Sequence, residues 1–217
     1  MLELLFRRDA SAPLKILCLG AHSDDIEIGC GGTILRLIRL YPAASVRWIV
    51  FSSDGDVRRD EALLGANLLL ERAAEKSVVV KRFRESFFPY AGEQIKECFE
   101  EIKPDFEPDV VFTHYRGDLH QDHKVVGDLT WNTFRRSLIL EYEIPKWDGD
   151  LGSPNCYVRL SEDLVEQKVR AICETFKSQS AKPWFAADTF RALMRLRGLE
   201  SNVPFAEAFY GRKLVLG

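Results

Sequence analysis

The stretch LKILCLG, residues 14–20, decides the fold class of this chain. It is a short apolar run closed by a glycine, and such a run is typical of a buried β-strand. A polar loop follows, and residues 33–40 then show apolar side chains at helical spacing. Pro42 ends this pattern, because proline cannot continue a helix. The opening of the chain therefore predicts a buried strand followed by a helix.

The same alternation continues along the chain. We predict further strands at 46–51, 78–80, 110–113, 138–144 and 157–160, and further helices at 58–75, at 92–102, from 124 to about 136, from 161 onward and at 187–199. This alternation is typical of a Rossmann-like, three-layer α/β fold with a mostly parallel sheet. In the strand order 3-2-1-4-5, strands 1 and 4 are neighbours, and ligands bind beyond their carboxyl ends. We therefore expect the functional site at the C-terminal ends of strands 1 and 4.

Length and charge limit the classes of protein to consider. The 217 residues fit one domain, which we place at 1–217, and we expect its C-terminal third, about 145–217, to shape specificity. The net charge is −3, whereas surfaces that bind nucleic acid are basic. No stretch approaches the roughly 18 apolar residues of a membrane span. We expect no nucleic-acid partner and no membrane span.

The cysteines indicate a reducing compartment. The five of them are dispersed and form no CxxC pair. Disulfide frameworks and thiolate zinc sites use paired, regularly spaced cysteines. Residues 1–13 also hold charged side chains where a signal peptide needs a long apolar stretch. We therefore expect a cytoplasmic protein.

Histidine is rare and clustered in this sequence. The chain has four, and three of them (His114, His120 and His123) lie within ten residues that follow the predicted fourth strand. The remaining one, His22, lies in an acidic cluster after the first strand. Residues 20–34 lack the third glycine of the G-x-G-x-x-G pattern that dinucleotide binding needs. Because the two clusters follow strands 1 and 4, we expect them to form one site.

These residues can hold a single metal ion. A catalytic zinc site needs three protein ligands and an open position for water. His22, Asp25 and His123 supply two imidazoles and one carboxylate, and a bound zinc ion would lower the pKa of the water toward ~7. The same ligand types bind Fe(II) in oxygenases. A zinc hydrolase and an Fe(II) oxygenase are therefore both compatible with this ligand set.

Neighbouring side chains supply acid–base chemistry. Asp24 is free to act as a general base, and His120 could stabilise an oxyanion or protonate a leaving amine. Asp122 or Asp118 could hold His120 in the required tautomer. We therefore assign catalytic roles to Asp24, His120 and Asp122.

Two motifs carry a family resemblance. Residues 21–34, AHSDDIEIGCGGTI, closely resemble the A-H-P-D-D-x-E-x-G-x-G-G-T motif of the LmbE-like (PIG-L) deacetylases. Residues 114–123, HYRGDLHQDH, resemble the second histidine motif of that family, and AEAF at 206–209 is similar to a further family feature. Members of the family are zinc-dependent hydrolases that remove N-acetyl groups from glucosamine-type sugars and their conjugates. The resemblance implies the same α/β fold and activity for this chain.

Transferred by position, the resemblance implies roles for individual residues. It implies His22, Asp25 and His123 as zinc ligands, Asp24 as the general base, and His120 as the oxyanion stabiliser or acid. These roles agree with those argued from the residues themselves.

Other residues near the two motifs are candidates for substrate binding. Arg58 and Glu61 match an R-x-x-E pattern of many members, and Arg58 could contact a substrate hydroxyl or phosphate or lie on a solvated helix start. We also count Asp118 and His114 as candidate substrate contacts. Ser23 stands where the family motif most often has proline, which leaves the loop less rigid but removes no ligand.

The C-terminal third holds aromatic side chains near predicted loops. Trp147, Trp184, Phe185 and Tyr210 are of this kind. Sugar rings pack well on aromatic faces, and aromatic side chains also fill cores. We carry both interpretations for each of the four.

The residues predict a metal-dependent hydrolase that uses a metal-activated water, and the resemblance implies zinc as the metal and an N-acetylated amino sugar or glycoconjugate as the substrate. The predicted cofactor is one Zn²⁺ per chain, with Fe²⁺ or another divalent metal as the alternative. The predicted partner is a small N-acetylated sugar. The sequence does not define the oligomeric state, and a homo-oligomer is compatible with the family analogy. The alternative functions are an Fe(II)-dependent oxygenase and a non-catalytic sugar-binding domain. The identity of the acceptor sugar stays open.

Overall fold

A seven-stranded sheet forms the centre of the computed structural model, which describes residues 6 and 12–215. The strand order is β3-β2-β1-β4-β5-β7-β6. The strands are β1 (Lys15–Gly20), β2 (Ser45–Val50), β3 (Glu75–Val80), β4 (Val110–His114), β5 (Leu138–Tyr142), β6 (Cys156–Leu160) and β7 (Phe205–Gly211). Strands β1 to β5 pair in parallel, and β7 pairs antiparallel with both β5 and β6. The predicted order 3-2-1-4-5 and the mostly parallel sheet are confirmed.

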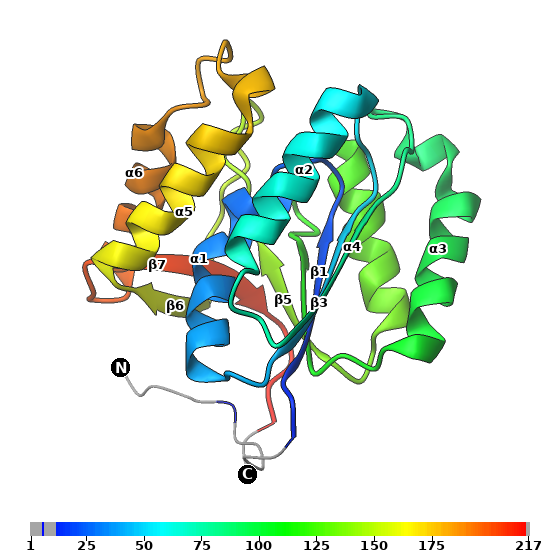
Figure 1. The fold of residues 1–217 in the computed structure, drawn as a ribbon, viewed down its shortest axis with the longest axis horizontal. Helices are drawn as coiled ribbons and strands as arrows, with labels where there is room; N and C mark the ends of the chain where they lie inside the picture. The colour runs from blue at the N-terminus through cyan, green and yellow to red at the C-terminus, as the bar shows by residue number, and fades with distance from the viewer. Residues whose placement is uncertain (1–5, 7–11, 216–217) are drawn as a thin grey trace.

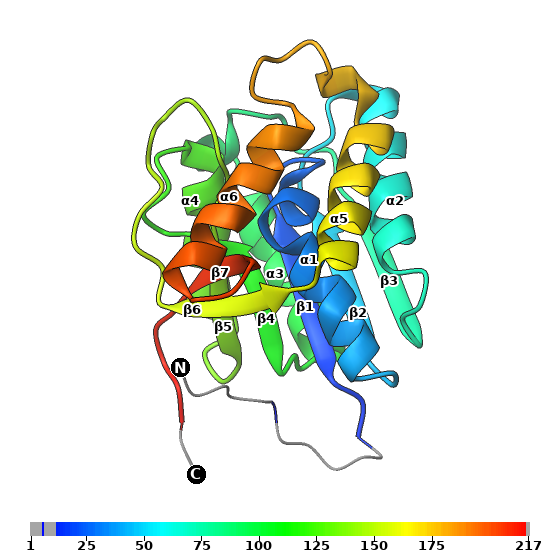
Figure 2. The same cartoon turned by 90° about the vertical axis from the view of Figure 1, so that its left-hand side faces the viewer.

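Helices cover both faces of the sheet. They are α1 (Asp25–Leu40), α2 (Gly55–Leu69), α3 (Gly92–Asp105), α4 (Gln121–Thr133), α5 (Glu162–Thr175) and α6 (Ala187–Glu200), with short 3-10 helices η1 (Phe88–Tyr90) and η2 (Lys177–Gln179). Figure 1 shows α3 and α4 on one side of the sheet and α1, α2 and α5 on the other, and Figure 2 shows α6 beside α5. The predicted three-layer α/β fold is confirmed.

Residues 16–19 of β1 are all apolar because both faces of the strand are buried. Ile16 and Cys18 point into the core under α1, α2 and α5. Leu17 and Leu19 point into a second core under α3 and α4. A central parallel strand needs apolar side chains on both faces, which explains the continuous apolar run.

Helix α1 begins at Asp25 rather than at residue 33 as predicted, so the glycine-rich stretch lies within the helix. Glycine disfavours helix interiors, which is why the pattern indicated a loop. Here the glycines allow close packing instead. A Cβ at Gly29 would lie 2.2 Å from the ring of Tyr142, and one at Gly32 would lie 2.7 Å from Leu160. The predicted end of the next helix was also wrong, because α2 ends at Leu69 and not at residue 75.

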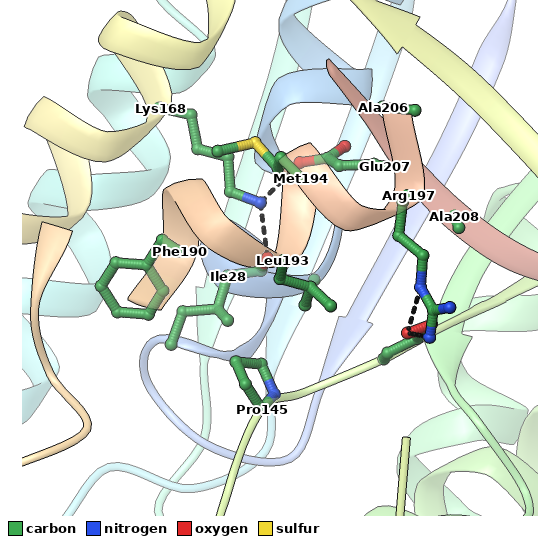
Figure 3. A pocket seen from close by; sticks show the side chains of 12 residues that line it. Ile28, Pro145, Lys168, Phe190, Leu193, Met194, Arg197, Ala206, Glu207 and Ala208 are labelled. Carbon is green, nitrogen blue, oxygen red and sulfur yellow. Dashed lines mark hydrogen bonds and ion pairs between the residues drawn. The ribbon is translucent and has the colours of Figure 1, made fainter. Parts of the chain in front are cut away.

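Strand β7 lies between β5 and β6 and was not among the predicted strands. A charged residue, Glu207, stands in the middle of this strand and is buried. Its carboxylate accepts the backbone N–H groups of Gly32 and Thr33 in α1 and pairs with Lys168 of α5 at 2.6 Å. Lys168 also donates to the carbonyl of Ile28 (Figure 3). The C-terminal third is therefore joined to α1 through a buried ion pair.

A Gly29→Ala variant should be less stable than the natural sequence by about 1–3 kcal/mol, the usual cost of overpacking a core. The reason is that Tyr142 cannot move aside easily, since it is fully buried and its hydroxyl donates to the carbonyl of Leu19 at 2.7 Å. Urea unfolding followed by circular dichroism measures the change. Gly92→Ala is the matched control, because a Cβ there meets nothing within 4 Å. Equal stability of Gly29→Ala and the natural sequence would contradict the close packing.

Within the described residues, no helix is both long enough and apolar enough to cross a bilayer. Most of the N-terminal segment used to argue against a signal peptide lies outside the described residues.

Candidate active site

The first half of the site is the turn between β1 and α1. The backbone N–H of His22 donates to Oδ2 of Asp25 at 2.6 Å, which closes the turn at the carboxyl end of β1. Asp25 is the first residue of α1, and Asp24 precedes it at the N-cap position. This local hydrogen bond fixes the imidazole of His22 and the carboxylate of Asp25 on one side of the turn, with a 3.4 Å gap between Nδ1 and Oδ2.

The second half is the start of α4, after β4. His120 is the N-cap of this helix, and its Nδ1 accepts the backbone N–H of Asp122 at 3.2 Å. His123 lies in the first turn of the helix. Because β1 and β4 are adjacent parallel strands, their carboxyl ends bring the two clusters together, as the strand order predicted.

Three predicted ligand side chains converge at this point. His22 Nδ1 lies 3.2 Å from His123 Nε2 and 3.4 Å from Asp25 Oδ2, and His123 Nε2 lies 3.6 Å from Asp25 Oδ1. Zinc bonds of about 2.0–2.1 Å in tetrahedral geometry put ligand atoms about 3.3 Å apart, so the spacing fits such an ion. Two overlapping triads, His22 with His120 and His123, and Asp25 with His114 and His123, also have ligand atoms within 4.8 Å of one another.

The imidazoles of His22 and His123 each contact a carboxylate through the ring nitrogen that faces away from the other ligands. His22 Nε2 lies 3.1 Å from Oδ2 of Asp122, and His123 Nδ1 lies 2.8 Å from Oδ2 of Asp118. A carboxylate accepts an N–H, so in the neutral rings the protons lie on these far nitrogens. The facing atoms, His22 Nδ1 and His123 Nε2, are then both lone-pair acceptors. Two acceptors and a carboxylate directed at one point attract positive charge, which a bound cation or a proton on one of the rings can supply.

The electrostatics agree with this attraction of positive charge. Burial alone would lower the pKa of His22, but the carboxylates of Asp25 and Asp122 raise it to about 10. Burial alone would raise the pKa of Asp25, but the imidazoles of His123 and His114 bring it well below its usual range. The surroundings therefore favour a positive charge at the point where His22, Asp25 and His123 converge.

His120 lies beside the triad and is half-buried. Its ring centroid is 4.9 Å from that of His22 and 4.6 Å from that of His123. Burial and the nearby His22 lower the pKa of His120, so the ring is neutral at pH 7. Since its Nδ1 accepts a backbone N–H, the proton is on Nε2, which is a free donor for an oxyanion.

The carboxylates expected to hold the His120 ring bind elsewhere. Asp122 pairs with His22, and Asp118 pairs with His123 while its Oδ1 accepts the backbone N–H of His120 at 2.7 Å. The tautomer of His120 is instead set by the backbone N–H of Asp122. The prediction of a carboxylate partner for this ring was wrong, because the helix N-terminus supplies the donor.

His114 is fully buried behind the triad. Its Nε2 accepts the backbone N–H of Ala21 at 2.9 Å and lies 3.2 Å from Asp25 Oδ2, and its ring stacks on His123 with centroids 3.9 Å apart. The structure therefore places His114 against the proposed ligand side chains, whereas a substrate contact was predicted for it. Asp118 is also buried, against His123.

Asp24 and Asp25 are adjacent but have different partners. Asp24 Oδ1 lies 3.0 Å from Arg58, which also bonds Glu61 at 3.2 Å. The Arg58 side chain is 13% exposed, so it lies against Asp24 rather than on a solvated helix start. Burial raises the pKa of Asp24, and the Arg58 guanidinium partly offsets this rise.

Sequence reasoning missed several groups that support the site. Lys146 donates to Asp118 at 2.8 Å. The backbone N–H groups of Ser86 and Phe88 donate to the carboxylate of Asp122 at 2.6 and 3.1 Å. Lys146 and Ser86 lie in irregular segments and Phe88 begins the short helix η1, so no hydrophobic periodicity in the sequence signals these contacts.

The four aromatic candidates of the C-terminal third divide into two kinds. Trp147 is 78% exposed. Phe185 is buried, Trp184 packs edge-on against it, and Tyr210 stacks on Tyr115 with ring centroids 3.8 Å apart. Of the four, Trp147 is therefore the one that presents an open face.

Comparison with known proteins identifies the family. The model of the family described as PIG-L, GlcNAc-PI de-N-acetylase, matches residues 17–134, more than half of the chain. The chain belongs to the PIG-L family. It is 30% identical over 166 residues to the uncharacterized deacetylase YaiS of Escherichia coli, covering 72% of this chain and 88% of that protein. It is 29% identical over 191 residues to the diacetylchitobiose deacetylase of Thermococcus kodakarensis, covering 76% and 70%.

A solved structure of another protein shows the same fold. The N,N′-diacetylchitobiose deacetylase from Pyrococcus horikoshii superimposes with a TM-score of 0.69 at 24% identity, covering 93% of this chain and 86% of that one. The superposition includes the C-terminal third, which lies outside the range of the family match. The matched range contains both histidine clusters, so they belong to the part of the chain that defines the PIG-L family.

Proposed function

We propose that this PIG-L member is a zinc-dependent hydrolase that removes the N-acetyl group from a small amino sugar or glycoconjugate. The observation that carries the proposal is the convergence of His22 Nδ1, His123 Nε2 and the Asp25 carboxylate at the spacing of tetrahedral zinc ligands. The substrate class comes from the relatives, two of which are named as diacetylchitobiose deacetylases.

The donor set fits zinc and leaves room for a reactant. His22, Asp25 and His123 would hold the ion, and Asp122 and Asp118 would orient the two imidazoles. Zinc bound there would polarise the acetyl carbonyl and lower the pKa of a water molecule, which is the chemistry that amide hydrolysis needs.

The remaining steps fall to side chains of the chain itself. Asp24 takes a proton from the water that attacks the acetyl carbonyl, and Arg58 holds the Asp24 carboxylate in place. The Nε2–H of His120 donates to the oxyanion as the carbonyl becomes tetrahedral. The proton gained by Asp24 passes to the departing nitrogen, so the C–N bond breaks to give acetate and a free amine.

Family membership favours this hydrolysis over the Fe(II) oxygenase that the same ligands would allow. The presence of Asp24 and His120 at the site favours hydrolysis over a non-catalytic sugar-binding domain. The proposal places the enzyme in the cytoplasm, in keeping with its five free cysteines.

Acetate release from N-acetylated sugars tests the proposal. Zinc-loaded protein is incubated with N-acetylglucosamine, N,N′-diacetylchitobiose and a nucleotide-linked N-acetylglucosamine, each beside a chelated sample. We expect release from at least one substrate, loss of release on chelation and recovery on adding zinc back. No release from any of the three by protein with metal confirmed bound would contradict the substrate class. Oxygen consumption with Fe(II) and a 2-oxo acid would favour the oxygenase.

A further inference from the structure

The segment between β5 and β6, residues 143–155, has no helix or strand of its own. Its position therefore depends on side-chain contacts. Near its two ends, Arg197 of α6 pairs with Glu143 at 2.6 Å and donates to the carbonyl of Gly152 at 3.0 Å. Figure 3 shows the bond that Arg197 makes near the start of the segment. These contacts fix the ends of the segment but not its middle.

The side chains of Lys146 and Asp150 hold the middle of the segment against residues 118–119. Lys146 Nζ lies 2.8 Å from Asp118 Oδ2 and 2.6 Å from Asp150 Oδ2. Asp150 Oδ2 also accepts the backbone N–H of Leu119 at 2.7 Å. The segment is thus joined twice to residues 118–119, immediately before His120.

The charge arrangement makes Lys146 the necessary member of this cluster. Its side chain is 11% exposed, and those of Asp118 and Asp150 are 3% and 7% exposed. Without the ammonium group, two buried carboxylates would face each other and repel. Asp118 is held by His123, so Asp150 and its segment would be the part to move away.

The residue that follows Lys146 in this segment is an exposed aromatic. Trp147 follows Lys146 directly, so their Cα atoms lie about 3.8 Å apart. The Trp147 side chain is 78% exposed, although tryptophan is a large apolar residue. Aromatic faces pack well against the apolar faces of sugar rings.

We propose that Lys146 is a positioning residue that holds residues 146–150 against the Asp118–His123 pair, so that Trp147 forms one wall of the sugar-binding site. This inference rests on the proposed function for the identity of the ligand, an N-acetylated sugar. It assigns Lys146 to substrate positioning and not to the chemical step.

The first test needs neither metal nor substrate. Amide hydrogen exchange is compared between metal-free Lys146→Met and metal-free natural protein. We expect faster exchange over residues 145–151 and at the Leu119 amide, and unchanged exchange in the β-strands. Lys146→Arg, which keeps the charge, should restore most of the protection. Lys103→Met is the matched control, because Lys103 is an exposed lysine of α3 far along the chain from the segment. Unchanged exchange in Lys146→Met would overturn the positioning role.

The second test separates binding from turnover with N,N′-diacetylchitobiose as the probe. Lys146→Met and Trp147→Ala should each raise KM about tenfold, equivalent to about 1.4 kcal/mol of binding free energy, with kcat nearly unchanged. The double variant should have a KM no higher than that of Trp147→Ala, because both changes remove the same wall. The zinc affinity of Lys146→Met should equal that of the natural protein, whereas Asp118→Asn should lower the zinc affinity about 10–100-fold.

The outcomes of the two tests are distinguishable. KM effects that multiply in the double variant would overturn the shared wall. If the natural protein releases no acetate from any sugar, the proposed function fails, and the exchange experiment still decides whether Lys146 positions the segment.

Discussion

An Asp24→Asn enzyme should bind zinc as tightly as the natural sequence and release acetate about 10²–10⁴-fold more slowly, the range expected for loss of a general base. Asparagine matches the size of aspartate, so the turn before α1 is kept, and Asp25 still faces the imidazoles. The amide cannot accept the proton of the attacking water. Burial also raises the pKa of Asp24, which makes its carboxylate a stronger base than a solvated one, and the variant loses this group.

The measurement is kcat/KM on the best substrate, with zinc content determined on the same samples. Asp25→Ala serves as the contrast, because it removes a ligand and should lose the metal together with turnover. Asp54→Asn, an exposed aspartate in the turn before α2, is the control for the loss of one negative charge. Equal activity of Asp24→Asn and the natural enzyme would exclude Asp24 as the base.

A Lys168→Met variant should lose about 3–5 kcal/mol of unfolding free energy, the usual effect of removing one partner of a buried ion pair. Both side chains of the Lys168–Glu207 pair are 3% exposed. The variant leaves the Glu207 carboxylate buried without its cation and leaves the carbonyl of Ile28 without its side-chain donor. Urea unfolding with linear extrapolation gives the change in free energy.

Adding Glu207→Gln to Lys168→Met should recover part of the loss, because the unpaired charge is gone. Arg39→Met is the control, since Arg39 pairs with Asp163 at the surface, where ion pairs contribute about 0–1 kcal/mol. If Lys168→Met and Arg39→Met cost the same, the buried pair does not hold the C-terminal third to α1.

The parts of the site that were predictable are those that follow a buried strand directly. The apolar run of β1 leads into His22 and Asp25, and that of β4 leads into His114 and the residues up to His123. Strand periodicity is local, and parallel pairing places the carboxyl ends side by side, so residues about 100 positions apart could be expected to meet.

The parts that were not predictable depend on contacts between distant, non-periodic segments. Lys146 reaches Asp118 from an irregular loop, and Ser86 reaches Asp122 from another. Residues 206–209 were noted only for their family resemblance, because a charged side chain within a short apolar run is not typical of a buried strand. The partners of Glu207 lie in α1 and α5, so only the assembled structure shows why it is buried.

The place of β7 in the sheet also determines when the fold can be completed. β7 follows every other strand in the chain, yet it lies between β5 and β6, and β6 joins the sheet through it. During synthesis, the five parallel strands and their helices emerge first and can pair as a unit. Until residues 205–211 leave the ribosome, the edge of β5 is unpaired and Lys168 lacks its ion-pair partner Glu207. Because an unpaired strand edge can pair with other chains, the β5 edge of a nascent chain is open to wrong pairing until β7 is made.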